Sequence, residues 1–265
     1  MRQRSEPMLN IPGVVAALVL LLAGLHGLRE WVLTDDTMLW EMAFIPARFA
    51  MMFGVDPVQA LADRLAAEPD SAEAVWRVAL ARELAAEGAT KPRTALSYAL
   101  LHASWTHLIV NTIWLVAFGS AVARRFGAAR FLAFMALTAV GGAAGHFLTN
   151  AEDVTPMIGA SAAISGCMAA ALRFAFRPGA PLGGFSLGGD DAYRLPAMRL
   201  ADVLRDRRSL TFLLVWLVMN VATGLGASEL RLTDAAIAWQ AHMGGFIVGL
   251  LAFPLLDPPP LRPAA

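Results

Sequence analysis

Two residues far apart in the chain have the chemistry of a nucleophile and its general base. Ser161 lies in the small-residue stretch GASAAISG (159–166), at the start of an apolar run that reaches Phe176. His242 lies in the stretch AHMGGFIVG (241–249), near the other end of the chain. A serine hydroxyl becomes reactive when a neighbouring base accepts its proton, and a neutral histidine suits that role near neutral pH. The two side chains therefore predict a serine–histidine pair for acyl transfer.

A second polar stretch, HASWTHLIVN (102–111), could supply hydrogen-bond donors to the same reaction. His107 and Asn111 are four positions apart, so they share a face where the chain is helical. Acyl transfer creates an oxyanion that needs preorganised donors. We expect the imidazole of His107, the amide of Asn111 and the backbone N–H of Ser161 to provide them. His102 has two open interpretations: it belongs to the site, or it is structural and hydrogen-bonds a loop backbone.

The composition indicates where this chemistry would take place. Hydrophobic residues make up 57% of the 265 residues, and charged residues make up 16%. Soluble domains carry about 25% charged and about 45–50% apolar residues. The difference indicates a polytopic membrane protein, which we expect to be all-α. The formal net charge is zero, so it gives no bias toward nucleic acid, and the single cysteine, Cys167, excludes an intramolecular disulfide.

Apolar runs that could form membrane-spanning helices occur six times. A span needs about 20 predominantly apolar residues. The predicted spans are 11–28, 95–118, 131–148, 157–176, 210–226 and 236–256. The first run could instead be a signal peptide, but no Ala-x-Ala pattern closes it. The predicted organisation is a cytoplasmic tail (1–10), the first span (11–28), an extracytoplasmic loop (29–94), the five-helix remainder (95–256, with a cytoplasmic loop at 177–209) and a second cytoplasmic tail (257–265).

The long loop 29–94 is predicted to contain short helices over 63–68 and 72–84, with a break at 68–71. Two interpretations of these helices stay open. They form an excursion into solvent, or they lie at the membrane interface. Trp40, Trp76 and the cluster 51–53 (Met-Met-Phe) favour the interface, where such side chains bury their apolar parts.

Arginines distinguish the two sides of the membrane, because short cytoplasmic loops carry an excess of Lys and Arg. With six spans, one side holds Arg2, Arg4, Arg124, Arg125, Arg130, Arg177, Arg194, Arg199, Arg205, Arg207, Arg208 and Arg262. Both termini are therefore expected in the cytoplasm. At a rise of about 1.5 Å per residue, Ser161 would lie about 6 Å and His242 about 9 Å below the outer face. This predicts a shallow site that opens to extracytoplasmic water.

Small residues on the fourth and sixth predicted spans could bring the serine and the histidine together, because such residues let membrane helices approach closely. They are Ala162, Gly166 and Ala170 on the fourth span, and Gly245 and Gly249 on the sixth. Gly159, just before the serine, would let backbone and substrate approach the nucleophile.

The stretches 102–111, 159–166 and 241–249, in this order, resemble the motif set of the rhomboid intramembrane serine proteases. The resemblance covers residues 95–254 and leaves out the first span and the long loop. It implies a six-helix bundle in a bacterial inner or plasma membrane, with a water-filled site open to the outside. It implies no metal, nucleotide, organic cofactor or nucleic-acid partner. The implied partners are the lipid bilayer and single-pass membrane proteins, which the family cleaves near helix-destabilising residues.

Carried over residue by residue, the resemblance makes Ser161 the nucleophile and His242 the general base of a catalytic dyad. His107 and Asn111 match the oxyanion-stabilising pair of the family's His-x-x-x-x-His-x-x-x-Asn pattern, and His102 matches its first histidine.

Two positions depart from the family pattern. Ala162 stands where the family's Gly-x-Ser-Gly has its second glycine, and its methyl could crowd the turn after the serine. Ser165 stands where some members have a tyrosine that stacks on the histidine. His242 would then need another way to hold its orientation. Neither departure removes a reacting group.

Two other functions suit membrane helices that carry histidines. A rhomboid-like pseudoprotease would bind transmembrane helices as an adaptor without cutting them. Such a protein would have no need to keep all four side chains of the predicted site, which are Ser161, His242, His107 and Asn111. A transporter or channel would carry carboxylates or several histidines within its spans, and the predicted spans contain no Asp or Glu. The leading prediction is therefore an intramembrane serine endopeptidase.

Overall fold

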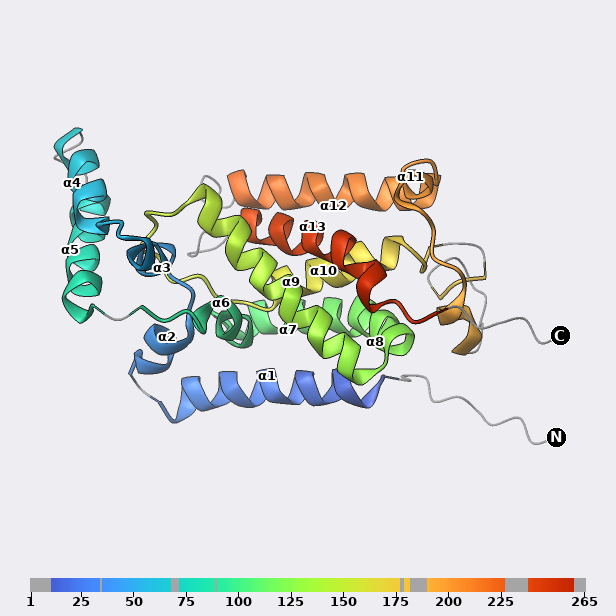
Figure 1. The fold of residues 1–265 in the computed structure, drawn as a ribbon. Helices are drawn as coiled ribbons and strands as arrows, with labels where there is room; N and C mark the ends of the chain where they lie inside the picture. The colour runs from blue at the N-terminus through green and yellow to red at the C-terminus, as the bar shows by residue number, and fades with distance from the viewer. Residues whose placement is uncertain are drawn as a thin grey trace.

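The computed structural model describes residues 11–33, 35–67, 72–88, 90–176, 179–181, 190–226 and 238–259. Regular structure among these residues is helical, with one isolated antiparallel bridge between Phe44 and Met157. The long helices form one bundle in which α9 (Ala128–Thr149) runs obliquely across the others, and the short helices of the loop 29–94 gather at one end of it (Figure 1). The predicted all-α fold is thus confirmed for the described residues.

Several helices are long and apolar enough to cross a membrane. Four of those described meet both criteria: α1 (Gly13–Trp31), the continuous helix Trp105–Phe126, α9 (Ala128–Thr149) and α13 (Trp239–Leu256). α10 (Ser161–Leu172) is apolar but shorter, and α12 (Arg207–Gly226) begins with two arginines. These apolar helices identify an integral membrane protein, whereas the count of six spans stays a prediction.

The second long helix differs from the predicted span 95–118 at both ends. Its parts are α7 (Trp105–Trp114), the π-helical turn η3 (Leu115–Gly119) and α8 (Ser120–Phe126). Before it lie α6 (Thr94–Ser97) and the 3-10 turn η2 (Tyr98–Leu100). The helix starts where it does because the Ser104 hydroxyl accepts a hydrogen bond from the His107 N–H at 3.2 Å, which caps the first turn. His102 therefore lies before the helix and not within it.

α10 also begins later than the apolar run 157–176. Met157 exchanges two backbone hydrogen bonds with Phe44, at 2.8 and 3.1 Å. Gly159 follows with a φ of +126°, so the chain becomes helical only at Ser161. α13 begins at Trp239, and residues 236–237 of the predicted sixth span lie outside the described residues.

α10 is the central helix of the bundle, because every residue from Ala162 to Leu172 is buried. It packs against α9 and α13, which also pack against each other. A Cβ built on Gly249 of α13 would lie 2.6 Å from the Cα of Gly166 on α10. Side chains at this crossing would force the two helices apart, so the small residues maintain the packing.

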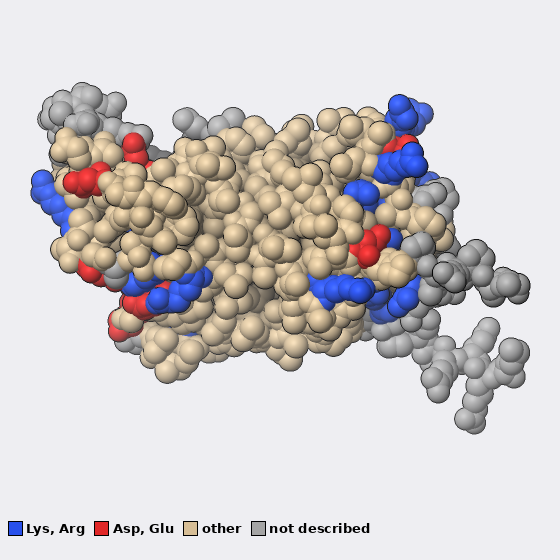
Figure 2. Space-filling view, viewed as in Figure 1, with Lys and Arg blue, Asp and Glu red and all other residues tan. Residues whose placement is uncertain are grey.

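Charged side chains gather at the two ends of the molecule. On the face shown in Figure 2, a broad central band lacks Lys, Arg, Asp and Glu. Such a band is the surface that a lipid bilayer requires, because unpaired charges are costly in hydrocarbon.

A buried arginine joins several segments at the end where α1 begins and α13 ends. Arg125 is 4% exposed, pairs with Asp257 at 2.6 Å, and donates to the carbonyls of Tyr193 and Leu195. The predicted loop 177–209 here contains the 3-10 turn η4 (Asp190–Arg194) and α11 (Leu200–Val203). Residues 177–178 and 182–189 of this loop, and the tails 1–10 and 260–265, lie outside the described residues.

The loop 29–94 folds around a small core of its own. Its helices are α2 (Thr37–Met42), α3 (Pro46–Ala50), η1 (Met51–Phe53), α4 (Pro57–Ala67) and α5 (Ala72–Glu87). Ile45, Val78 and Leu84 are among the buried residues that hold them together. The predicted helix 72–84 is part of α5, and 63–67 is part of α4, whereas the predicted break at 68–71 lies outside the described residues.

α4 and α5 lie across the end of the bundle (Figure 1). Phe53 and Trp76 are 66% and 50% exposed. Such side chains suit the membrane interface, but solvent contact is equally compatible with them, and both interpretations of the loop stay open.

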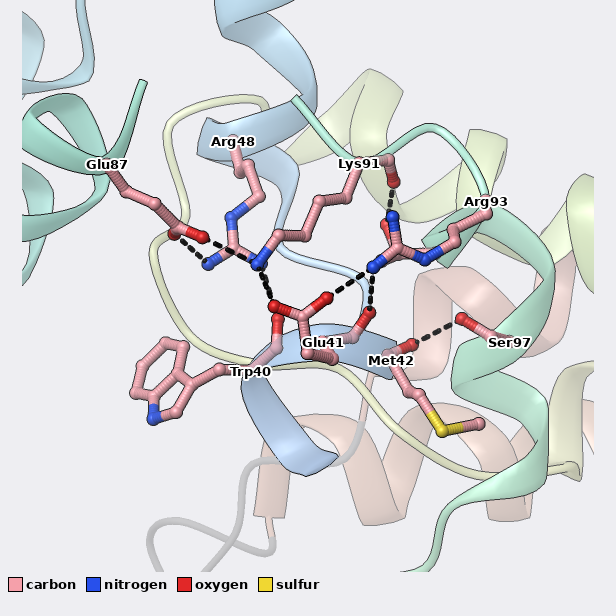
Figure 3. Close-up of polar contacts among 9 residues, drawn as sticks. Trp40, Glu41, Met42, Arg48, Glu87, Lys91, Arg93 and Ser97 are labelled. Atoms are coloured by element: carbon pink, nitrogen blue, oxygen red, sulfur yellow. Dashed lines mark hydrogen bonds and ion pairs between the residues drawn. The ribbon is translucent and has the colours of Figure 1, made fainter. Parts of the chain in front are cut away.

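An ion network ties the loop helices to the segment before α6 (Figure 3). The Nζ of Lys91 lies 2.7 Å from Glu41 on α2 and 2.6 Å from Glu87 at the end of α5. Glu87 also pairs with the buried Arg48 at 2.8 Å, and Glu41 pairs with Arg93. Since two carboxylates bridge three cations, the network fixes α2, α3 and α5 relative to one another.

Candidate active site

Ser161 and His242 meet at one end of α10 and α13. Ser161 is the first residue of α10, and His242 lies in the first turn of α13. The Nε2 of His242 and the Oγ of Ser161 are 2.7 Å apart, a hydrogen-bonding distance. Both residues are half-buried. The structure thus brings together the two residues that the sequence singles out as nucleophile and base.

Small side chains set the spacing of the helices that carry this pair. A Cβ on Gly245 would lie 2.7 Å from the carbonyl carbon of Ala162. The methyl of Ala162 faces Gly142 of α9, where a side chain would collide with it. The alanine that departs from the family pattern is therefore accommodated by a glycine on the neighbouring helix, and its methyl does not crowd the serine turn.

Gly159 lies between the serine turn and the ring of His107. Its φ of +126° is in a region that L-residues with a side chain rarely adopt. A Cβ at this position would lie 2.9 Å from the Cε1 and 3.0 Å from the Nε2 of His107. It would also lie 3.6 Å from the Oγ of Ser161. Both the backbone conformation and the space require a glycine here.

The hydrogen bonds of His107 define its tautomer. The backbone N–H of Ala103 donates to its Nδ1 at 3.3 Å. Because an N–H can only donate, Nδ1 must be the acceptor, and the proton of the neutral ring is then on Nε2. That nitrogen is the one beside Gly159. The ring therefore has its donor nitrogen beside Gly159, two residues before Ser161.

Asn111 and His102 surround His107 on the side of α7. Asn111 is buried, and its Nδ2 donates to the carbonyl of His107 at 2.9 Å. One amide hydrogen is thus used within the helix, and the second is the one that an oxyanion would need. The ring of His102 packs edge-on against that of His107, with centroids 5.1 Å apart. Within the described part of the chain, neither ring nitrogen of His102 has a hydrogen-bond partner, so its observed contact is one of packing.

One polar side chain of the site is not among the residues predicted from the sequence. The Oδ1 of Asn220, on α12, lies 2.7 Å from the Nδ1 of His242. The hydroxyl of Ser165, at the position of the family's tyrosine, instead donates to the carbonyl of Ser161 at 2.8 Å. Asn220 is the only amide in the predicted span 210–226, and a buried amide in a membrane helix is a signal that could have identified it.

No group of three or more His, Cys, Asp or Glu side chains suited to a metal ion occurs in the described ranges.

A helical bundle with apolar spans and a serine–histidine contact at one end of its central helix defines a class of integral membrane proteins. The chain belongs to the rhomboid family: the family model of the rhomboid domain matches residues 89–258, more than half of the chain. The match contains every site residue described above. No curated protein matches the chain.

Proposed function

We propose that this protein is an intramembrane serine endopeptidase that cleaves peptide bonds in or near the transmembrane segments of other membrane proteins. The observation that carries the proposal is the 2.7 Å contact between Ser161 Oγ and His242 Nε2. Membership of the rhomboid family supports it, as does the lipid-compatible band on the surface of the bundle.

The contact suits nucleophilic catalysis step by step. His242 Nε2 takes the proton of the Ser161 hydroxyl while Oγ forms a bond to the carbonyl carbon of the scissile peptide. The C–N bond then breaks, and the same nitrogen returns the proton to the leaving amine. A water molecule hydrolyses the resulting acyl-enzyme, with His242 again as the base.

Donors for the oxyanion lie on the side of Ser161 that faces α7. The Nε2–H of His107 is close to Gly159, and the second amide hydrogen of Asn111 comes from the same helix. Ser161 itself begins α10, and the first N–H groups of a helix have no partner within it. These groups could stabilise the negative charge that develops on the carbonyl oxygen.

We propose that the water for deacylation reaches the serine turn from a neighbouring cavity. A cavity of about 510 Å³ has Ala103 and Ile158 in its lining. Ile158 directly precedes Gly159, and Ala103 is the residue that hydrogen-bonds the His107 ring. The other six lining residues lie between Arg29 and Leu39, so the cavity borders the residue before Gly159 and does not include Ser161 in its lining.

The proposed topology has six spans, with α10 and α12 added to the four long apolar helices. Both termini then lie in the cytoplasm, and the site opens on the extracytoplasmic side. The arginines near the ends of α8 and α11 support this orientation under the positive-inside rule.

The decisive experiment is cleavage of a model single-pass substrate by the protein in liposomes. We expect wild type to cleave and to be labelled at Ser161 by a fluorophosphonate. Ser161→Ala and His242→Ala should each lower kcat by about 10³-fold or more. Ser165→Ala, which removes a hydroxyl one turn along α10, should retain activity.

Two results would contradict this proposal. Cleavage that survives Ser161→Ala would remove the assigned nucleophile. Absence of both cleavage and labelling by wild type, across several substrates, would favour the alternative of an adaptor that binds transmembrane helices without cutting them.

A further inference from the structure

Asn220 is a buried polar residue on an otherwise apolar stretch of α12. The residue is 5% exposed, whereas Val218 and Met219 beside it are 64% and 58% exposed. An amide is costly in a membrane helix unless its polar atoms are paired. Both ends of this amide have partners, His242 Nδ1 at 2.7 Å and the carbonyl of Trp239 at 3.2 Å. The residue is therefore directed at the first turn of α13.

The carbonyl of Trp239 determines which way the amide points. A carbonyl can only accept, so the NH2 group of Asn220 must face Trp239, and the oxygen must face His242. An amide oxygen can also only accept, so the proton of the neutral His242 ring must be on Nδ1. Its Nε2 is then unprotonated, and this is the nitrogen 2.7 Å from Ser161 Oγ. Together, the contacts of Asn220 with Trp239 and with His242 require the Nδ1–H tautomer of His242. In this tautomer, the Nε2 beside Ser161 can act as a base.

Two further contacts hold α12 against α13 on either side of this amide. One turn before Asn220, the ring of Trp216 stacks on Phe246 with centroids 4.2 Å apart. One turn after it, Gly224 lies so close to Trp239 that a Cβ there would be 2.5 Å from the Trp239 Cγ. Positions 216, 220 and 224 share one helix face. The packing of α12 against α13 therefore sets the orientation of the Asn220 amide.

We propose that Asn220 is a positioning residue that fixes the ring orientation and the tautomer of His242, extending the serine–histidine pair to a Ser161–His242–Asn220 arrangement. This inference rests on the proposed function. Some family members orient this histidine with a stacking tyrosine where this chain has Ser165. Here the hydrogen bond between Asn220 and the edge of the His242 ring would take over that role. Asparagine serves this purpose in the Cys-His-Asn arrangement of papain-like proteases, where its neutral oxygen orients the ring.

The first measurement is kinetic. Asn220→Leu keeps the approximate size of the side chain but removes the acceptor, and Asn220→Ala is a second variant in case leucine does not fit. We expect kcat to fall about 10- to 100-fold and KM to stay within about twofold, because the general base is misplaced while substrate binding is unaffected. Asn220→Asp retains the acceptor and should recover much of the activity. Thr223→Val is the matched control, since among the described residues that hydroxyl donates to carbonyls of its own helix and to no residue of α13.

The second measurement does not depend on proteolysis. The chain has five histidines, so 15N-histidine labelling gives a spectrum simple enough to assign His242 through its loss in His242→Gln. We expect the Nδ1–H tautomer at His242 in wild type and in Thr223→Val. Asn220→Leu should shift the signal toward Nε2–H or a mixture of the two forms.

The outcomes separate this inference from the proposed function. Wild-type kcat in folded Asn220→Leu, or an unchanged tautomer in it, would overturn the positioning role and leave the Ser161–His242 pair intact. A protein that cleaves nothing but shows the tautomer shift would support the role of Asn220 while refuting the proposed activity.

Discussion

At the scale of single residues, Gly159 shows how a position without a side chain can control a reaction. Its φ of +126° and its closeness to the ring of His107 impose two separate requirements. Gly159→Ala would add backbone strain of about 1–3 kcal/mol and displace the donor nitrogen. We expect kcat/KM for the model substrate to fall about tenfold or more, with slower fluorophosphonate labelling of Ser161.

Gly54 provides the control for that substitution. It also has a positive φ, of +78°, but a Cβ there would meet nothing within 4 Å. Gly54→Ala should therefore retain wild-type kcat/KM. Full activity in Gly159→Ala would show that the donor from His107 does not contribute to catalysis.

The residue types of the site could be predicted, but some of their roles could not. Serine and histidine are recognisable because few side chains can act as nucleophile and base, and their small neighbours predict close helix packing. Asn220 could not be assigned to His242 because no spacing in the sequence relates α12 to the first turn of α13. The tautomers of His107 and His242 likewise depend on carbonyl and N–H groups that only the folded backbone brings near.

At the scale of elements, the ion network of the long loop makes stability depend on pH. The hydrogen bond from Lys91 lowers the pKa of Glu41 and of Glu87 below the usual range for glutamate. The unfolded chain then binds more protons than the folded one as the pH falls below about 4.5, so stability decreases with acidification there. We expect the Tm of the wild type to drop between about pH 5 and pH 3, and that of Lys91→Met to drop less.

Arg205→Met is the comparison for the pH series, because it removes a cation from the exposed pair with Asp202 of α11. Exposed pairs of this kind contribute little, so its pH profile should follow that of the wild type. Identical profiles for Lys91→Met and wild type would show that the network does not stabilise the fold.

Helices could be predicted more reliably than their ends. Apolar runs located the long helices, because hydrophobicity persists over about 20 residues. Their ends are set by single contacts, such as the Ser104 cap and the pairing of Met157 with Phe44. Hydrophobicity does not mark these ends, because apolar residues are buried on both sides of them. Leu101 in the loop before α7 and Ile164 within α10 are both buried.

At the scale of the whole molecule, the proposed orientation can be tested by labelling introduced cysteines, because the chain has a single cysteine of its own. Cys167 is the single cysteine and is buried. In a Cys167→Ala background, Ala79→Cys on α5 and Ala201→Cys on α11 place exposed thiols at opposite ends of the molecule. We expect a membrane-impermeant maleimide to label position 79 in intact cells and position 201 only after lysis. The reverse pattern would place the site on the cytoplasmic side.

The bridge between Phe44 and Met157 limits how far the chain can be shortened. The family match begins at residue 89, so Phe44 and the other loop residues from 29 to 88 lie outside it. Yet Phe44 supplies both backbone partners of Met157, and the N–H of Ala47 donates to the carbonyl of Asp153 at 2.9 Å. A chain trimmed to the matched segment would leave these groups unpaired just before the serine turn. We therefore expect the smallest segment that folds by itself to begin before Phe44, well outside the matched segment.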